Sequence, residues 1–233
     1  MDNKKFTITA IVPFYNEEMT LEKSINELAK IKIVDEIFLV DDNSNDKSTE
    51  VATRLEKKIK KISYFRLPLN SGKGGAVIFP INKVTTSHVV IHDADLEYNP
   101  LDINQLFYQI NGTDSLIIGD RFAKNNNNIV QMNLILKIIE RFSTILFNIL
   151  YKTSLNDIGT GYKLIPTKFL KDTNFVEKGF FFDIEVLAKF VMSGGQILQA
   201  PIGYNGRDKD GGKKNNIITM IKFPLKVLLI RFS

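Results

Sequence analysis

The sequence predicts an α/β protein with a mainly parallel central sheet and helices on both faces of that sheet. One observation is a strict alternation of strand-like and helix-like segments over the first hundred residues. That order implies right-handed crossovers, which place successive strands in parallel. A second observation is that the chain has 233 residues, of which 44% are hydrophobic and 24% are charged, as is typical of a domain with a full core.

The elements follow one another in a regular order. We expect apolar strands at 6–14, 34–42, 62–68, 87–95 and 114–122. We expect helices at 16–31 and 46–61, and a third helix after the glycine-rich turn at 70–76. Leu21, Ile25 and Leu28 give the first helix one apolar face. The asparagine-rich run at 124–128 predicts an exposed loop.

The composition excludes several kinds of site. The chain contains no cysteine, which excludes disulfides, a thiolate nucleophile and a cysteine-based zinc site. No apolar run reaches the roughly 18 residues of a membrane span, and we expect no signal peptide. The formal net charge of +5 favours acidic partners, which include nucleotide phosphates, anionic lipid and nucleic acid.

Three acidic residues follow the fourth strand candidate in the stretch "VVIHDADLEYNP". Asp93, Asp95 and Glu97 stand at every second position, so in an extended segment they would crowd one side. The stretches "IVPFYNEE" and "LVDDNSND" end two other strands in acidic residues, and the carboxyl ends of parallel strands share one edge, where ligands bind. A divalent cation would relieve this repulsion and bridge to phosphate, and ligands that are all oxygen suit Mg²⁺ or Mn²⁺. We therefore predict a metal site, with a solvated acidic turn as the alternative.

The glycine-rich stretch "NSGKGGAV" does not fit two common nucleotide-binding motifs. It lacks the upstream glycine and the Ser or Thr that an ATP-binding P-loop requires. No G-x-G-x-x-G follows the first strand, which argues against a dinucleotide-binding dehydrogenase. A flexible turn that lets the backbone approach a sugar nucleotide fits better.

Seven stretches occur in the order and approximate spacing of a known family. They are "IVPFYNEE", "VDDNSND", "NSGKGGAV", "HDADLEYNP", "IGDRF", "DIGTGYK" and "FFFDIEVL". Together they resemble the family 2 glycosyltransferases of the GT-A fold, and most of all the polyprenyl-phosphate sugar transferases, which include dolichyl-phosphate mannose and glucose synthases. The resemblance runs from about residue 6 to residue 215 and implies a GT-A nucleotide-sugar-binding domain over residues 1–216. "NSGKGGAV" leans towards the branch that transfers glucose.

The resemblance also implies roles for individual residues. It places the nucleotide against Pro13, Tyr15, Glu17, Val40, Asp42, Asp93 and Ala94. It makes Asp93, Asp95 and Glu97 the ligands of Mg²⁺ or Mn²⁺. It implies that Asp95, Arg121, Asp157 and Asp183 are catalytic. It places Arg207 and Lys213, in a glycine-rich basic loop, on the diphosphate.

Local alternatives stand beside several of these assignments. Asp183 could be a charge at the start of a helix, and the loop with Arg207 and Lys213 could simply be solvated. Tyr15 could simply pack, Glu17 could be a favourable charge in the first turn of a helix, and Arg121 could pair with Asp120. The chain also departs from the family at Gly159, where relatives more often carry a side chain.

The expected reaction is an inverting hexose transfer from a donor of the UDP-glucose or GDP-mannose type to a polyprenyl phosphate. A phosphate monoester is mostly dianionic at neutral pH, because its second pKa is about 6, so it needs no catalytic base. His88 and His92 are then expected to serve packing or surface roles. Two alternatives remain, namely a transferase of the same fold that builds a soluble or cell-surface glycan, and an inactive nucleotide-sugar-binding module. No nucleic-acid partner is expected.

Two apolar segments point to a membrane surface. Residues 129–151 predict a helix with a narrow polar stripe and a wide apolar face, which could meet membrane, a second subunit of a homo-oligomer, or the core. Residues 217–233 predict an apolar, basic tail in which Pro224 should break or kink a helix. Such a tail suits the interface of a bilayer, so we expect a peripheral protein on the cytoplasmic side of a membrane.

Overall fold

A computed structural model describes residues 6–112, 114–123, 130–206 and 222–232. The first half contains β1 (Ile8–Phe14), α1 (Leu21–Leu28), β2 (Glu36–Asp41), α2 (Ser48–Lys58), β3 (Ile62–Arg66), α3 (Gly72–Ile78), η1 (Ile81–Lys83), β4 (His88–Ile91), η2 (Pro100–Asp102), α4 (Ile103–Tyr108) and β5 (Leu116–Asp120). The second half contains β6 (Val130–Gln131), α5 (Leu134–Tyr151), β7 (Lys163–Pro166), α6 (Thr167–Asp172), α7 (Phe182–Met192), β8 (Ile197–Pro201), β9 (Tyr204–Asn205) and α9 (Phe223–Phe232).

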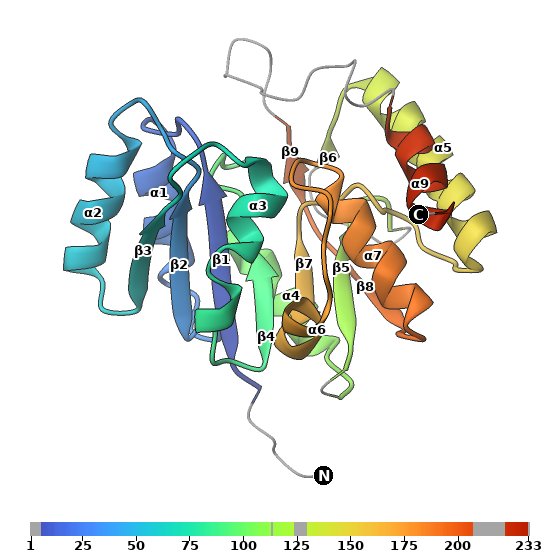
Figure 1. The fold of residues 1–233 in the computed structure, drawn as a ribbon, viewed down its shortest axis with the longest axis horizontal. Helices are drawn as coiled ribbons and strands as arrows, with labels where there is room; N and C mark the ends of the chain where they lie inside the picture. Colours follow the sequence, from blue (N-terminus) through green and yellow to red (C-terminus); the bar gives the residue numbers. More distant parts are fainter. Residues whose placement is uncertain (1–5, 113, 124–129, 207–221, 233) are drawn as a thin grey trace.

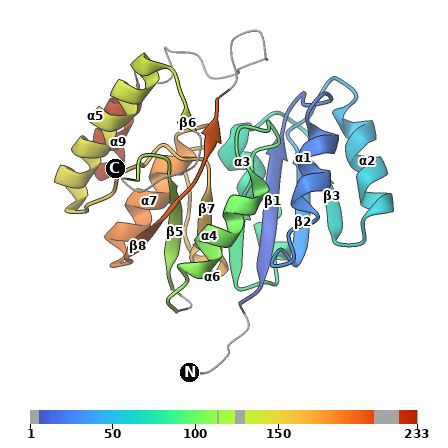
Figure 2. The same ribbon diagram turned by 180° about the vertical axis from the view of Figure 1, so that it is seen from behind.

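The main sheet, within the described residues, has seven strands in the order β3-β2-β1-β4-β7-β5-β8 (Figure 1). All neighbours pair in parallel except β7, which runs antiparallel to both β4 and β5. Helices lie on both faces, with α3, α6 and α7 on one side and α1 and α4 on the other (Figures 1 and 2). The predicted fold class is confirmed.

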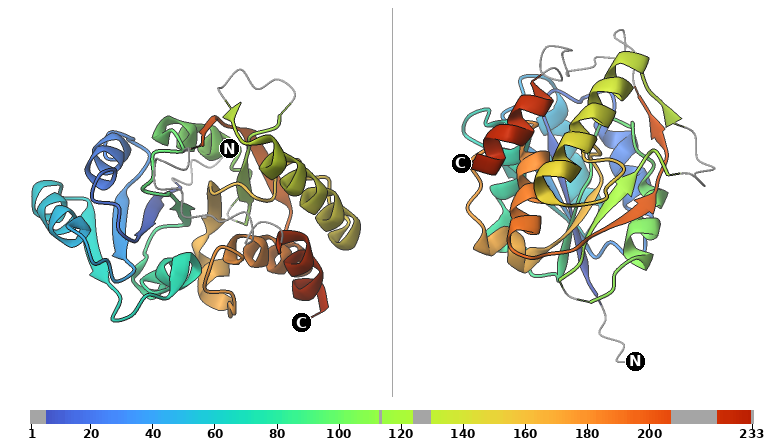
Figure 3. Two further views of the ribbon diagram at one scale, coloured as in Figure 1. Left: turned by 90° about the horizontal axis from the view of Figure 1, so that it is seen from above. Right: turned by 90° about the vertical axis from the view of Figure 1, so that its right-hand side faces the viewer.

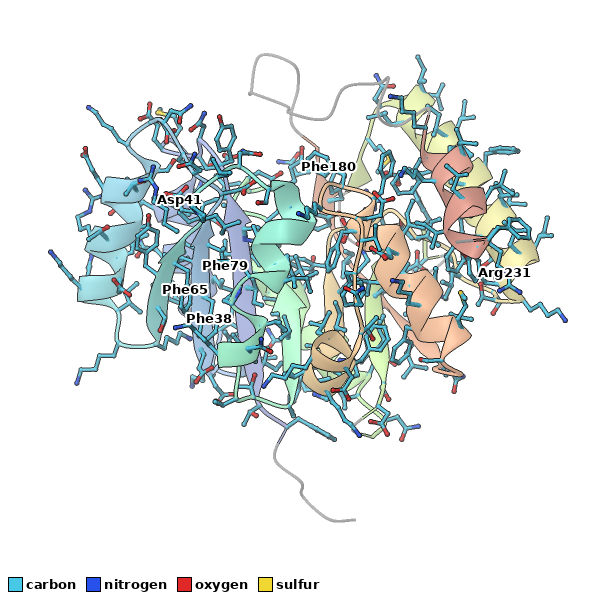
Figure 4. The ribbon with its side chains drawn as sticks, viewed as in Figure 1. Phe38, Asp41, Phe65, Phe79, Phe180 and Arg231 are labelled. Carbon is cyan, nitrogen blue, oxygen red and sulfur yellow. The ribbon has the colours of Figure 1, made fainter. Side chains whose placement is uncertain are left out.

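The two faces of the sheet carry separate parts of the core. Alternate residues of β1 point to opposite faces, so Ala10 and Val12 pack with α1, α2 and α4, whereas Ile11 packs with α3 and α7. The strand is buried at every position, which explains its continuous apolar run. Figure 4 labels Phe38 and Phe65, which lie on the α3 side of the sheet. Their rings pack edge to face, with 5.0 Å between the ring centroids.

The reversed direction of β7 brings a second group of loops to one edge of the sheet. The parallel strands β1, β2, β4 and β5 all end at that edge. Because β7 runs the other way, the loop that precedes it, residues 157–162, lies at the same edge. Motifs from both halves of the chain therefore meet there.

Helix α5 turns a wide apolar face to solvent, whereas an ordinary surface helix turns its apolar face to the core. Of the predicted polar stripe, Glu140 and Thr144 are buried, whereas Asn133, Lys137 and Arg141 are exposed. Its exposed large apolar residues are Leu134, Ile135, Ile138, Phe142, Ile145 and Ile149. The helix meets the core through Phe147 and Tyr151, while this apolar face is turned to solvent, where a membrane or a second subunit remains as the expected occupant.

Helix α9 lies beside α5 at the same end of the molecule (Figure 3). Its inner residues Phe223, Val227 and Ile230 join the core, while Leu225, Leu229 and Phe232 are exposed. Pro224 lies in the first turn of α9, where the missing N–H has no partner to lose, so within the described residues it stands at the start of a helix and does not interrupt one. The expected domain boundary at 216 lies outside the described residues. None of the helices in the described ranges is long and apolar enough to span a bilayer.

Candidate active site

A cavity of about 460 Å³ lies where the motif-bearing loops meet. The predicted residues that line it are Pro13, Tyr15, Glu17, Asp42, Asp93, Ala94, Asp95, Glu97, Arg121 and Asp183. Val40 is fully buried in the core and Asp157 is fully buried behind the wall, so neither lines the cavity. Arg207 and Lys213 lie outside the described residues. Phe180, which also lines the cavity, is labelled near the upper edge of the molecule in Figure 4.

The acidic stretch 93–97 forms a turn and not the end of a strand. Strand β4 ends at Ile91, and Leu96 adopts a left-handed backbone with φ of +63°. A left-handed conformation costs roughly 1–2 kcal/mol for a residue with a Cβ, and such strain is concentrated at functional sites. The expectation that an extended chain aligns the three carboxylates is therefore wrong. The turn itself brings Asp93, Asp95 and Glu97 to the cavity wall.

Lys73 links the glycine-rich turn to two of the predicted acidic residues. Its Nζ lies 3.1 Å from Asp93 and 3.2 Å from Asp183. Burial alone would lower the pKa of Lys73, but Asp183 and Asp93 raise it above its ordinary value. Asp183 also pairs with the buried Lys163 at 2.9 Å, and the two lysines outweigh burial and lower the pKa of Asp183. Asp183 is thus ionised and salt-bridged, which makes it a poor proton acceptor.

Asp42 holds the glycine-rich turn in place. Its carboxylate accepts hydrogen bonds from the backbone N–H groups of Ser71 at 2.6 Å and Gly72 at 2.7 Å. Burial raises the pKa of Asp42, against the lowering effect of these two hydrogen bonds. The second and third parallel crossovers, which contain Asp42 and the glycine-rich turn, are therefore tied together beside the cavity.

Arg121 is the centre of a buried ion cluster. Its guanidinium binds both oxygens of Asp157, at 2.7 and 2.8 Å, and also binds Glu140 of α5. These longer-range partners, and not the local alternative Asp120, are the acids that its side chain pairs with in the described contacts. Asp157 thus positions Arg121 from behind. Glu140 lines the cavity and was missed by the motif argument, although a single glutamate within a long apolar helix is itself a signal.

The pKa of Glu140 leads to a prediction of pH-dependent stability. Burial raises this pKa from 4.5 to about 7, and Asp157 adds to the rise, while Arg121 and Lys163 oppose it. Between pH 4.5 and 7 the folded protein therefore retains a proton that the unfolded chain releases, so the contribution of Glu140 to stability falls as the pH rises. In urea unfolding, Glu140→Gln should gain stability relative to the wild type between pH 5 and pH 8. A difference independent of pH would contradict the assignment.

One wall of the cavity is formed by the end of β1 and the loop that follows it. The backbone N–H of Glu17 donates to Ser48, and its carboxylate accepts a hydrogen bond from Thr20, which fixes its orientation. The hydroxyl group of Tyr15 accepts a hydrogen bond from Asn45 at 3.3 Å. These contacts hold the side chains of Tyr15 and Glu17 in place at the cavity wall, beside Pro13.

Both histidines are buried and lie outside the cavity wall. The two ring nitrogens of His92 lie 3.0 Å from the hydroxyl oxygen of Ser24 and 2.7 Å from that of Tyr162. Burial lowers the pKa of His92 and of His88 to about 4 in each case. Both rings are therefore neutral at pH 7 and serve packing.

Tyr98 and Gly161 shape the wall around Asp93. The hydroxyl oxygen of Tyr98 accepts a hydrogen bond from the backbone N–H of Gly161 at 2.8 Å. A Cβ at position 161 would lie 2.5 Å from Asp93, so only glycine permits this approach. The loop before β7 is thereby locked against the acidic turn.

The charges at the cavity suit a divalent cation. Its acidic lining residues are Glu17, Asp42, Asp93, Asp95, Glu97, Glu140 and Asp183. Within the described ranges, Lys73 and Arg121 are the basic ones, and both already pair with carboxylates. A diphosphate would be repelled unless a further cation entered with it. No cluster of three or more metal-binding side chains is preassembled in the described part of the chain. Mg²⁺, however, commonly takes one or two carboxylates and completes its shell with substrate phosphates.

The sequence of the chain matches a family model over most of this fold. Residues 9–173, which supply β1 to β7, match the model of glycosyl transferase family 2. The chain belongs to glycosyl transferase family 2. The matched region of the transferase includes most of the strand ends and loops that line the cavity.

Curated relatives of the transferase include two enzymes named dolichyl-phosphate beta-glucosyltransferase. The one from Saccharomyces cerevisiae is 27% identical over 257 residues, which cover 100% of this chain and 76% of the yeast protein. The one from Dictyostelium discoideum is 27% identical over 247 residues, which cover 97% of this chain and 74% of that protein.

Solved structures with the same fold include glucosyl-3-phosphoglycerate synthase from Mycobacterium tuberculosis. Its complex with UDP gives a TM-score of 0.73 at 18% identity and covers 98% of this chain and 79% of that one. Its complex with Mn²⁺ and UDP-glucose gives a TM-score of 0.73 at 20% identity and covers 97% of this chain and 79% of that one. The transferase therefore has the GT-A fold.

Proposed function

We propose that the transferase moves a hexose, with inversion, from a nucleotide sugar of the UDP-glucose or GDP-mannose type to a polyprenyl phosphate at a membrane surface. The observation that carries this proposal is the double role of α5 and α9. Both helices expose apolar side chains to solvent, and both also supply the cavity wall, through Glu140 and Phe223. A lipid that entered along these helices would reach the cavity directly. The names of the yeast and Dictyostelium relatives support a lipid phosphate as acceptor.

The chemistry requires charge neutralisation and placement, and no catalytic base. The acceptor phosphate is dianionic because its second pKa is about 6. Asp95, with Asp93 and Glu97 beside it, would hold Mg²⁺ or Mn²⁺, which supplies positive charge at the donor diphosphate. Arg121 and Lys73, fixed by buried carboxylates, orient the anionic groups for in-line attack. Arg207 and Lys213, which lie between β9 and α9 in the sequence, are proposed to add further positive charges.

The donor can be identified by stabilisation in the presence of metal. Because the cavity is acidic, UDP-glucose or GDP-mannose should raise the melting temperature only when Mg²⁺ or Mn²⁺ is present, and EDTA should abolish the shift. The measurement is a thermal melt with each donor, with and without metal. Equal stabilisation with chelator present would contradict the metal assignment, and a shift with neither donor would contradict the proposed donor class.

The outer faces of α5 and α9 are proposed to lie on an anionic membrane surface. The exposed cations Lys137, Arg141 and Arg231 flank the apolar side chains, and each would contribute about 1 kcal/mol near such a surface. This arrangement suits a helix pair that lies in the interface. The cytoplasmic leaflet, which is the anionic one, is the proposed face. A second copy of the chain is the competing occupant of these faces.

Substitutions on α5 test this placement. The triple variant Ile138→Gln, Phe142→Gln, Ile145→Gln should bind anionic liposomes at least about tenfold more weakly, because each buried apolar side chain is worth about 1.5–3 kcal/mol. All three residues are exposed, so the melting temperature should barely change. The control variant Met19→Gln, Leu101→Gln, Met192→Gln changes exposed apolar residues on other elements. In flotation assays the control should bind as the wild type does; equal loss in both variants would contradict the proposal.

A further inference from the structure

The carboxylate of Glu140 has one oxygen that is fixed and one that is available. Its Oε2 is bound by the Nη2 group of Arg121, and Arg121 is itself fixed by Asp157. Its Oε1 accepts no hydrogen bond from any residue in the described ranges, and Glu140 lines the cavity. Glu140 is only 5% exposed, so α5, whose outer face is turned to solvent, holds this carboxylate at the cavity wall with its inner face.

The absence of a side chain at Gly159 makes room for this carboxylate. A Cβ at position 159 would lie 3.0 Å from the Cδ of Glu140 and 3.1 Å from Oε1. Real Cβ atoms rarely approach a neighbour so closely, so any larger residue would displace the carboxylate. Gly159 also lines the cavity, which places this pair of residues at its wall.

We propose that Glu140 is a specificity-determining residue of the donor site, whose Oε1 accepts a hydrogen bond from a hydroxyl group of the transferred sugar. This inference rests on the proposed nucleotide-sugar donor and not on the proposed lipid acceptor.

The order of the strands supports this position for the sugar. The proposed nucleoside contacts follow β1 and β2, and the acidic turn follows β4. Beyond β4 the sheet continues with β7 and β5, next to the loop that contains Gly159. Adjacent strands are about 4.8 Å apart, so β5 lies about 10 Å beyond β4. A donor that lies along this edge would place its base, its diphosphate and its sugar in that order.

The sign of the charge favours a hydroxyl over a phosphate. A carboxylate repels an anionic phosphate, but it accepts strongly from a neutral hydroxyl group in a site that excludes water. A fixed acceptor also discriminates well, because a donor that lacks the matching hydroxyl leaves a buried polar group unpaired. Glu140 would therefore select among sugars that differ at one position.

The test compares the affinity for the complete donor with the affinity for its nucleoside diphosphate alone. Calorimetry would use whichever of UDP-glucose and GDP-mannose the wild type binds, together with UDP or GDP. In Glu140→Ala the dissociation constant of the sugar nucleotide should rise about tenfold, while that of the nucleoside diphosphate stays within about twofold. The control Glu185→Gln alters another buried carboxyl, which accepts hydrogen bonds from Val176 and Glu177 and does not line the cavity. It should leave both constants unchanged.

A second variant, Gly159→Ala, and donors that lack one hydroxyl group distinguish a lost sugar contact from a general folding defect. Gly159→Ala should weaken sugar-nucleotide binding in the wild-type background, but it should add nothing in Glu140→Ala, where no carboxylate remains to be displaced. Among monodeoxy analogues of the donor, one should bind Glu140→Ala and the wild type equally. If the nucleoside diphosphate loses affinity in the same proportion as the complete donor, or if every deoxy donor responds to the substitution, the inference is overturned. A failure of the lipid acceptor would appear only in transfer assays.

Discussion

Asp95→Asn should abolish transfer while leaving the fold intact. The side chain is half-buried at the cavity wall, and an amide keeps its shape but removes the charge that would hold Mg²⁺ or Mn²⁺. A metal ion contributes several kcal/mol to charge stabilisation, which corresponds to a loss of about 10³-fold in rate. The measurement is the initial rate of hexose transfer with saturating metal.

The matched control for this substitution is Asp172→Asn. Asp172 is exposed at the end of α6 and does not line the cavity, so this variant should retain full activity. EDTA should reproduce the effect of Asp95→Asn in the wild type. Full activity of the wild type in the presence of chelator would remove the basis for the metal site.

Arg121→Ala should be the most destabilising single substitution at the site. It would leave Asp157 and Glu140, which are 0% and 5% exposed, without their shared cation. Removing one partner of a buried ion pair costs about 3–5 kcal/mol, a large part of the stability of a domain. Urea unfolding at pH 7 measures the loss.

Arg54→Ala is the control for this prediction, because it removes an exposed ion pair with Glu22 at 2.8 Å. That loss should stay below about 1 kcal/mol. Adding Glu140→Gln to Arg121→Ala should change the stability little further at pH 7, because Arg121 opposes the rise in the pKa of Glu140 and its removal leaves Glu140 protonated. If Arg121→Ala unfolds at the same urea concentration as the wild type, the cluster does not contribute as described.

The sequence was sufficient for the fold class because β1, β2 and β4 are continuous apolar runs separated by helices of clear period. It did not predict the direction of β7, because four residues such as Lys163–Pro166 carry too little pattern to show which neighbours they pair with. The motif at 157–163 was found, but its meeting with the acidic turn depends on that reversed strand.

The cavity-lining residues were largely predictable because they sit at strand ends, and strand ends share an edge. Lys73 and Glu140 could not be placed in the same way. Lys73 pairs with Asp93 and Asp183, which belong to two other segments of the chain. Glu140 lies on a helix that is mostly apolar, so the sequence does not show which side of that helix faces the core. Tertiary packing decides such long-range pairs, and the hydrophobic periodicity of the sequence carries no information about them.

Transfer of labelled glucose from UDP-glucose to polyprenyl phosphate in liposomes tests the central proposal most directly. Purified wild-type protein with Mg²⁺ or Mn²⁺ should place the label in the lipid fraction, and an α-linked donor should give a β-linked lipid phosphate, as NMR of the anomeric carbon would show. Asp95→Asn should yield no labelled lipid. Label found in a soluble product such as an oligosaccharide, with none in the lipid, would contradict the proposed acceptor, and an α-linked lipid product would contradict inversion.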